Sequence, residues 1–245
     1  MNEIIKTLLY EKSNKIKKRL YEYVVVKMTY ESNKIEGSTL TLNETSELYN
    51  RNEITIINRN SIKLDELVES KNHFKAINFI LDNWNKTLSE DFIKKIHLIL
   101  FKNTHTNDEN FNVGNYKKYA NTIGSIIETT LPKDVGKEMK NLLSKYSKKR
   151  DKKIEDIIDF HYNFEKIHPF QDGNGRVGRL VMFKECLKEN IVPFIILEEE
   201  KAFYIRGLSE YENEKGFLID SCLHFQDQFK EKLEYFGVEV KEYKR

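Results

Sequence analysis

Residues 168–179 read HPFQDGNGRVGR, and this stretch determines the fold and the chemistry that we expect of the chain. Gly173 and Gly175 flank Asn174 and permit backbone angles that other residues avoid. Successive N–H groups in such a turn can converge on an anion. Apolar residues recur at helical spacing after the turn, which places it at a helix N-terminus. Because the helix dipole and the unpaired N–H groups both favour negative charge there, the stretch predicts a phosphate site.

Charged side chains in the same stretch suit a nucleotide. Arg176 and Arg179 are three residues apart on one helix face, and each guanidinium can bind phosphate oxygens through two donors. Asp172 is a candidate ligand for a Mg²⁺ that bridges phosphate oxygens. His168 is a candidate general base, because imidazole titrates near neutrality. A solvated helix face is the alternative for the arginines, and the adjacent glycine turn argues against it.

The residues before the turn predict a helix that delivers His168 to the site. Apolar residues and histidines recur at helical intervals over residues 154–168. Pro169 disfavours α geometry in the residue before it, so the helix should end at His168. We assign His161 and Phe170 to the core, because a histidine or a ring on an apolar face is usually packed there.

This stretch resembles the signature of the Fic family, HPFxDGNGRxxR with Asp or Glu at the fifth position, and it matches every signature position. The resemblance implies an all-α fold, a Fic-like helical bundle with a small β-hairpin flap beside the active-site loop. It also implies a protein adenylyltransferase that transfers AMP from ATP to a Ser, Thr or Tyr hydroxyl of a target protein, which in this family can be the enzyme itself. Mg²⁺ would stabilise the departing pyrophosphate.

The same resemblance assigns roles to individual residues. His168 acts as the general base, Asp172 holds Mg²⁺, and Arg176 and Arg179 clamp the β- and γ-phosphates. Asn174 and the N–H groups of the loop hold the α-phosphate. Similarity to the family's adenine-site segment adds two residues further along the chain. The residues assigned to nucleotide or phosphate are therefore Gly173, Asn174, Gly175, Arg176, Arg179, Tyr204 and Asn213.

Residues 31–38, ESNKIEGS, form a second informative stretch. Ser32 and Glu36 are four residues apart on one helix face, and Gly37 suits the left-handed end of a helix. The pattern resembles the Fic inhibitory motif, in which Ser or Thr is followed four residues later by Glu and then by Gly or Asn. The resemblance implies that Glu36 pairs with Arg179 and occupies the guanidinium that would otherwise hold the γ-phosphate.

Three functions stay open at this point. The resemblance favours AMP transfer, and Gly175 supports it because the phosphate-transferring branch of the family has lysine there. Some Fic proteins remove AMP, with the inhibitory glutamate orienting water, and Glu36 can serve that purpose too. The third function is a helical interaction module that only senses nucleotide. His168 and Asp172 argue against it, because pure binding needs neither.

Residues 119–131, YANTIGSIIETTL, predict a β-hairpin, because β-branched residues flank a Gly-Ser turn. It resembles the Fic flap, which borders the active site and pairs with the target as a strand would. The flap residues by this resemblance are Thr122, Ile123 and Gly124, and a plain surface hairpin is the alternative. Just upstream, Lys117 stands where arginine is common in the family, so a role there that requires a bidentate fork is in doubt.

The chain has 245 residues, with 41 Lys and Arg against 39 Asp and Glu, and this balance gives no argument for nucleic-acid binding. It has no run of about 18 apolar residues and no signal-peptide pattern, so we expect no membrane partner and a cytoplasmic location. Cys186 and Cys222 fit neither a disulfide framework nor a metal-site spacing, and we expect both to be reduced and structural. A homo-oligomer stays an open option.

We expect one compact unit. An N-terminal helical extension over residues 1–60 carries the inhibitory pattern, and a Fic-like catalytic domain covers residues 61–245. Residues 4–28 have helical periodicity. The helices predicted beyond residue 60 are Leu64–Trp84, Ser89–Phe101, Pro132–Tyr146, Ile154–Ile167, Asn174–Glu189, Lys201–Tyr211 and Gly216–Phe236.

Overall fold

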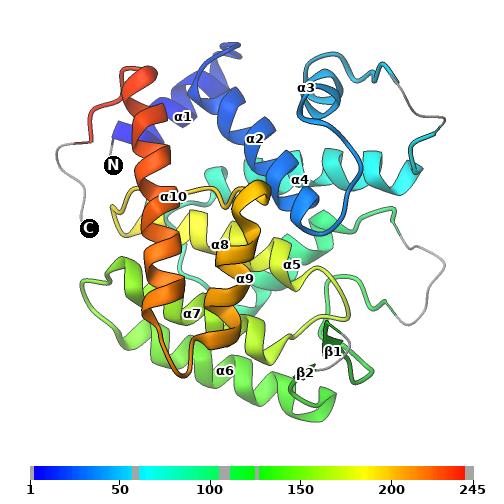
Figure 1. Ribbon diagram of the computed structural model, residues 1–245, viewed down its shortest axis with the longest axis vertical. Coiled ribbons are helices and arrows are strands. Elements are labelled where there is room, and N and C mark those ends of the chain that lie inside the picture. Colours follow the sequence, from blue (N-terminus) through cyan, green and yellow to red (C-terminus); the bar gives the residue numbers. More distant parts are fainter. Residues whose placement is uncertain (1–2, 57–60, 105–110, 125–126, 241–245) are drawn as a thin grey trace.

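The computed structural model describes residues 3–56, 61–104, 111–124 and 127–240, and α-helices make up most of them (Figure 1). The helices before the hairpin are α1 (Glu3–Ser13), α2 (Leu20–Ile35), α3 (Leu42–Arg51), α4 (Leu64–Asp82) and α5 (Glu90–Leu100). Those after it are α6 (Pro132–Lys148), α7 (Ile154–Ile167), α8 (Asn174–Lys188), the 3-10 helix η1 (Glu198–Glu200), α9 (Lys201–Glu210) and α10 (Gly216–Tyr235). The predicted all-α class is confirmed.

Helix α8 lies in the middle of the molecule because it is buried on almost every side (Figure 1). It packs against α2, α4, α5 and α7. Its buried side chains include Val177, Leu180 and Leu187. Its buried charges are paired, with Lys184 Nζ 2.6 Å from Glu185 Oε1. Because neighbours enclose this helix, its first turn and the loop before it have a fixed position.

The seven helices predicted beyond residue 60 are confirmed, with ends that agree within two residues. Local signals set these ends. Ser89 caps α5 by accepting a hydrogen bond from Phe92 N at 3.2 Å. Pro132 occupies the first position of α6, where its missing N–H costs nothing. Cys186 in α8 and Cys222 in α10 are buried thiols.

The helical periodicity of residues 4–28 is divided between two helices. Lys15 and Lys18 have positive φ angles of 53° and 58°, so the chain turns between α1 and α2. The buried carboxylate of Glu11 accepts a hydrogen bond from Tyr21 N at 2.8 Å and fixes the start of α2. Periodicity alone missed this break because both helices present apolar faces to the same core.

Helix α3 was not among the predicted helices. It begins with a capping box, in which Thr41 Oγ1 accepts from Glu44 N at 3.2 Å and the Glu44 carboxylate accepts from Thr41 N at 2.8 Å. Thr41 and Glu44 were therefore the signal that could have found it. The domain boundary expected after residue 60 adjoins residues 57–60, which lie outside the described residues.

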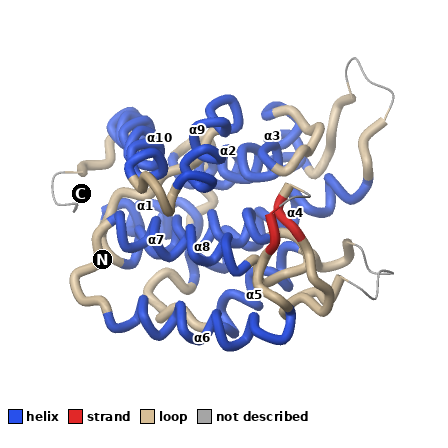
Figure 2. Tube along the Cα trace, turned by 60° about the horizontal axis from the view of Figure 1, so that its bottom comes forward, coloured by secondary structure: helices blue, strands red, loops and turns tan. Residues whose placement is uncertain are grey.

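The predicted hairpin is present but short. Strands β1 (Thr122–Ile123) and β2 (Ile127–Glu128) pair antiparallel at one side of the molecule (Figure 2). Thr122 pairs with Glu128 and Ile123 with Ile127. Gly124 begins the turn with a φ of +58°, and the other turn residue predicted, Ser125, lies outside the described residues.

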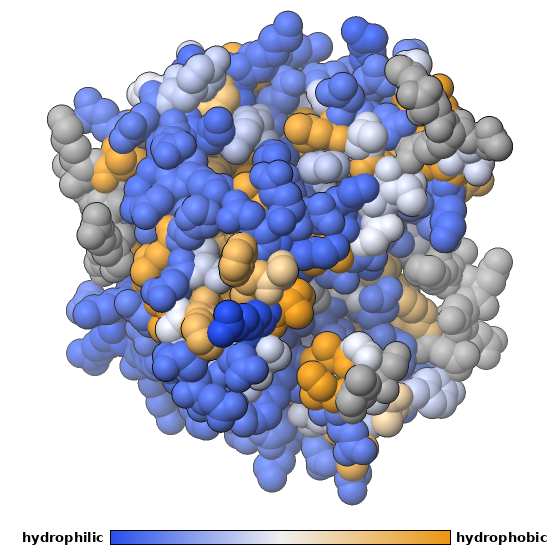
Figure 3. Space-filling model, in the orientation of Figure 1, coloured by the Kyte–Doolittle hydropathy of each residue, from blue (hydrophilic) through white to orange (hydrophobic). Residues whose placement is uncertain are grey.

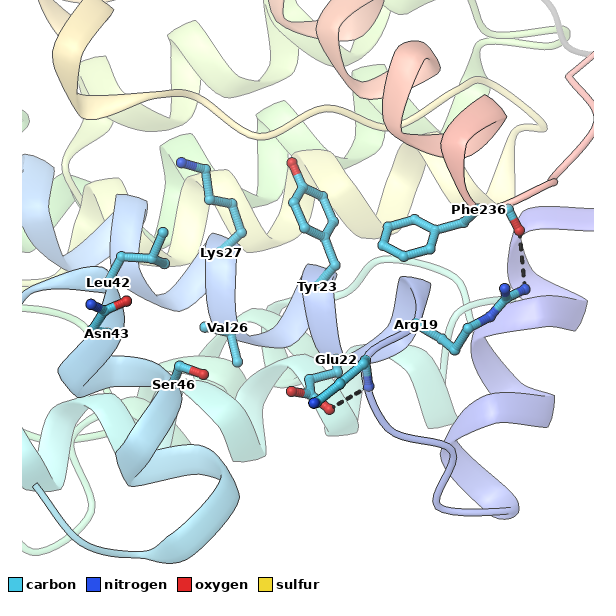
Figure 4. Close-up of a pocket in the computed structure, with 10 residues that line it drawn as sticks. Arg19, Glu22, Tyr23, Val26, Lys27, Leu42, Asn43, Ser46 and Phe236 are labelled. Carbon is cyan, nitrogen blue, oxygen red and sulfur yellow. Dashed lines mark hydrogen bonds between the residues drawn. The ribbon is translucent and has the colours of Figure 1, made fainter.

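Helix α2 packs on α4 and α8 with one side and borders a groove of about 330 Å³ with another (Figure 4). Two cations of this groove are paired within the protein. Arg19 donates to Phe236 O at 3.0 Å and lies 3.3 Å from the Glu11 carboxylate, and Lys27 lies 2.6 Å from Glu31. The bond from Arg19 to Phe236 O joins the start of α2 to the end of α10. None of the helices described combines the length and apolarity needed to cross a lipid bilayer.

Candidate functional site

The loop between α7 and α8 is held in one shape by its own backbone and by Asn174. Helix α7 ends at His168, as the sequence predicted, and this residue adopts a left-handed conformation (φ 51°, ψ 62°) before Pro169. Helix α8 begins after Gly173, whose φ of 77° is also left-handed. The Asn174 amide closes the loop, because its Oδ1 accepts from Phe170 N at 2.8 Å and its Nδ2 donates to Phe170 O at 3.0 Å. The Asn174 side chain is thus engaged by the loop itself.

Rings from α5 support this loop from beneath, a feature that sequence reasoning missed. Phe170 is buried, as predicted, and stacks on His97 with ring centroids 4.0 Å apart. His97 Nδ1 accepts from Gly114 N at 2.8 Å, so its Nε2 carries the proton and donates to Asp172 O at 3.2 Å. Burial lowers the pKa of His97 to about 3, which keeps this ring neutral.

His168 is set up to accept a proton. Its Nδ1 lies 3.3 Å from Glu165 O, and because a carbonyl only accepts, Nδ1 is the protonated nitrogen. The lone pair therefore resides on Nε2. Burial, together with the nearby positive charge of Lys117, lowers the pKa of His168 to about 4. At neutral pH the imidazole is uncharged, which is the state that a general base requires.

Arg176 lies buried at the first turn of α8. Its guanidinium pairs with Glu69 from α4, lies 3.6 Å from the Asp172 carboxylate and sits over the ring of Phe101 at 4.6 Å. The side chain of Asp172 is 51% exposed, and its Oδ1 accepts from Gly173 N at 2.5 Å. Glu69 and Phe101 were missed by the sequence analysis because they come from helices distant in the chain.

Arg179 forms its hydrogen bonds with residues at the C-terminal end of α2. Its Nη2 donates to Glu36 Oε1 at 2.7 Å and to Ser32 O at 3.0 Å, while its Nε donates to Ser32 Oγ at 3.0 Å. The expected ion pair between Glu36 and Arg179 is therefore present. Burial alone would raise the pKa of Glu36, but the Arg179 charge holds it below its usual value. Gly37 ends α2 in the left-handed conformation (φ 95°) that the sequence predicted.

The position of Gly175 matters for the same ion pair. A Cβ at residue 175 would stand 2.5 Å from Glu36 Oε1 and 2.8 Å from Arg179 Nη1. Real Cβ atoms do not approach other atoms that closely, so any side chain at 175 would displace one partner. The absence of a side chain at Gly175 is what allows the carboxylate to reach the guanidinium.

A buried polar group lies behind Arg179. Tyr204 OH and His161 Nε2 are 2.6 Å apart, and both residues are buried. The neighbouring Glu165 is buried as well, which raises its pKa to about 8 although the Arg179 charge lowers it. His161 is thus in the core, as predicted. Tyr204 lies in this interior, whereas Asn213 is exposed in the turn between α9 and α10.

The hairpin adds exposed apolar side chains next to the loop. Tyr119, Ile127 and Leu131 are each about half exposed, at 54%, 54% and 49%. Figure 3 shows a mostly hydrophilic face on which several apolar patches appear, among them patches over the hairpin and over α9. Phe203 and Ile205 are the exposed apolar residues of α9. Such a cluster beside a reactive loop is suited to contact with another protein.

The comparisons with known proteins agree with this geometry. Residues 87–186, which include the whole loop and most of α8, match the sequence profile of the Fic/DOC family. Residues 87–186 thus form a Fic domain. The Fic signature is thus the loop that Asn174 closes, and its histidine is the neutral His168.

Two curated proteins that are similar to this chain carry adenylyltransferase names. Over 197 residues it is 26% identical to the protein adenylyltransferase Fic of Nematostella vectensis, which covers 79% of this chain and 44% of that protein. Over 96 residues it is 31% identical to a probable protein adenylyltransferase of Aquifex aeolicus, which covers 36% of this chain and 29% of that protein. The matched part spans less than half of the length of each relative.

Two solved structures share the fold. A Fic domain containing signaling protein from Bacteroides thetaiotaomicron has a TM-score of 0.73 at 20% identity and covers 98% of this chain and 100% of that chain. A Fic family protein from Desulfovibrio desulfuricans has a TM-score of 0.73 at 20% identity, covering 95% and 72%. This likeness confirms the predicted Fic-like helical bundle with a small hairpin.

Proposed function

We propose that this protein is a protein adenylyltransferase, which transfers AMP from ATP to a hydroxyl of a target protein. The observation that carries the proposal is the neutral His168, with its Nε2 lone pair, beside the N-terminus of α8 and two buried arginines. The adenylyltransferase names of the two curated relatives support it. The exposed apolar hairpin supports a protein as the acceptor.

The reaction needs one proton acceptor and a place for negative charge. The hydroxyl oxygen of the target attacks the α-phosphorus of ATP, and the bond from that phosphorus to the oxygen bridging to the β-phosphorus breaks. The hydroxyl proton passes to His168 Nε2, and pyrophosphate leaves. Gly173 offers no capping side chain, so the first N–H groups of α8 are available to the α-phosphate. Because Asn174 is engaged with Phe170, its role in this scheme is to hold the loop.

Asp172 fits the Mg²⁺ ligand that the scheme includes. Its carboxylate is half exposed beside the helix N-terminus, and proteins commonly hold Mg²⁺ with one or two carboxylates plus substrate phosphates. Among the described residues no cluster of three or more His, Cys, Asp or Glu could hold a metal ion by itself. The other ligands would therefore come from ATP and water. Bound there, the ion would supply positive charge that offsets the charge of the departing pyrophosphate.

The proposal includes inhibition by Glu36. Its carboxylate pairs with the Arg179 guanidinium that would otherwise bind the γ-phosphate. Ser32 accepts two further hydrogen bonds from the same guanidinium. Because the carboxylate is tethered in the same chain, it competes at a high effective concentration. Glu36 is 34% exposed, so it can leave Arg179 without crossing the core.

The test is intact-mass spectrometry after incubation with ATP and Mg²⁺. We compare the wild type, Glu36→Gly, and Glu36→Gly with His168→Ala. Glu53→Gly is the matched control, because Glu53 is an exposed glutamate on another loop. We expect an AMP-sized adduct on Glu36→Gly that is at least about 100-fold slower to form with His168→Ala.

Other outcomes identify the alternatives. A phosphate-sized adduct would indicate phosphate transfer. Release of AMP from a modified protein by the wild type, lost in Glu36→Gly, would indicate AMP removal. Nucleotide binding without chemistry on any variant or added protein would leave a nucleotide-sensing module and overturn the proposal.

A further inference from the structure

Lys117, which the sequence marked as unusual, lies buried at the base of the hairpin. Only 3% of its surface is exposed. Its Nζ donates to Asn121 Oδ1 at 2.7 Å and to Thr129 Oγ1 at 2.6 Å. Asn121 immediately precedes β1, and Thr129 immediately follows β2. One ammonium group therefore closes the two ends of the hairpin onto each other.

The same base is joined to the catalytic loop. Lys117 N donates to Pro169 O at 2.9 Å, next to His168. Asn121 Nδ2 donates to Phe170 O at 3.1 Å and to Gln171 O at 3.3 Å. The hairpin and the loop are thus one hydrogen-bonded unit, with Lys117 and Asn121 at the junction.

The charge of Lys117 has no counterion in this unit. Both acceptors of its Nζ are neutral, and within the described ranges no carboxylate lies at ion-pairing distance from it. Burial lowers the pKa of Lys117 to about 8, so the group is charged at neutral pH. Three charged groups act on His168: Lys117 opposes its protonation, whereas Asp172 and Glu36 favour it.

We propose that Lys117 is a positioning residue that fixes the hairpin to the catalytic loop. The hydrogen bonds from its Nζ to Asn121 and Thr129 set the place of the hairpin, and its backbone N–H joins this base to Pro169 of the loop. Its buried charge also disfavours protonation of His168, for which burial is the larger cause. The catalytic meaning of this role rests on the proposed AMP transfer, but the contacts themselves do not.

The experiment follows the His168 imidazole by NMR titration and hairpin amides by hydrogen exchange. The variants are Lys117→Met, Lys117→Arg and the control Lys118→Met, which removes the exposed lysine next door. We expect Lys117→Met to raise the pKa of His168 by about half a unit or more and to speed exchange at Ile123 and Ile127 about tenfold or more. Lys117→Arg keeps the charge and two donors, and should stay near the wild type in the titration. Lys118→Met should change neither.

A second variant tests the hydrogen bonds apart from the charge. Thr129→Val removes one acceptor of Lys117 and keeps the charge, so hairpin exchange should rise. Unchanged hairpin exchange in Lys117→Met would overturn the inference, whatever the His168 titration shows. These readouts need no activity. If no AMP adduct forms on any variant, the proposed function fails while the role of Lys117 is still decided.

Discussion

The catalytic loop and the hairpin beside it are built in opposite ways. The loop, residues 168–173, is closed by Asn174, stacked on His97 and covered by the ring of Phe101. The hairpin, residues 119–131, has strands of two residues each and exposed apolar side chains. It is joined to the rest of the site at its base alone among the contacts described.

This difference separates reactivity from recognition. Chemistry requires atoms held within a fraction of an ångström, and only packed surroundings provide that. A partner surface must fit a chain that is not part of the protein, and a short, exposed hairpin can adjust to it. Changes in the loop should therefore affect stability and catalysis together, whereas changes in the hairpin should affect target use more than stability.

The largest expected effect comes from filling the loop glycine. In Gly173→Ala, the new Cβ would stand 2.5 Å from Phe101 Cζ at a φ of 77°. We expect a loss of about 2–4 kcal/mol in the free energy of unfolding and a loss of more than about 100-fold in AMP transfer in the Glu36→Gly background. Urea denaturation and adduct rates measure these. Gly124→Ala is the hairpin counterpart, with positive φ and open space, and should cost about 1 kcal/mol. Equal effects of the two changes would contradict the comparison.

Acid should weaken the interior around the loop. Burial lowers the pKa values of His73, His97 and His161 to about 3, below the ordinary value of 6.5. Between pH 6.5 and 3 these histidines are protonated in the unfolded chain but neutral in the folded protein. Their contribution to the free energy of unfolding is therefore complete above pH 6.5 and is lost as the pH drops toward 3. Each contributes a slope of about 1.4 kcal/mol per pH unit. Urea denaturation between pH 4.5 and 7 should show a slope lower by about that amount in His97→Gln, while replacing the exposed His224 should leave it unchanged.

The smallest effect on stability is expected in the hairpin. Ile127 is 54% exposed, so Ile127→Ser should change the free energy of unfolding by less than about 0.5 kcal/mol. We expect AMP transfer to a separate target protein to fall several-fold through KM, with kcat retained, because apolar contact with the target is lost. Leu64→Ser removes an exposed aliphatic residue from α4 and is the matched control. A fall in kcat with unchanged KM would place Ile127 in the chemistry instead.

Much of the fold followed from local signals. Pro169 and the left-handed His168 end α7, Gly173 opens α8, and periodicity placed the helices beyond residue 60. The sequence analysis missed α3, whose N-terminal signal is the capping box of Thr41 and Glu44. It missed the break between α1 and α2 because the two helices share one core face. The break is stabilised by a contact across it, from Tyr21 N to the Glu11 carboxylate.

In the candidate site too, local sequence spacing identified some residues and missed those that helix packing brings in. The signature identified His168, Asp172, Arg176 and Arg179, because their spacing on one loop and one helix turn is local. The sequence could not predict which residues contact and position them. These are His97 of α5 and Phe101 at its C-terminal end, Glu69 of α4, and Lys117 at the hairpin base. No periodic pattern links residues whose proximity results from helix packing.

By itself the sequence determined which groups the protein has and which helix ends carry them. Turn and helix geometry depend on neighbouring residues, and the sequence states those directly. Only the tertiary structure decided the state of these groups. Burial makes His168 neutral, and packing of α2 on α8 brings Glu36 to Arg179 across 143 residues of chain. Desolvation and charge act through space, so they depend on contacts that no local spacing records.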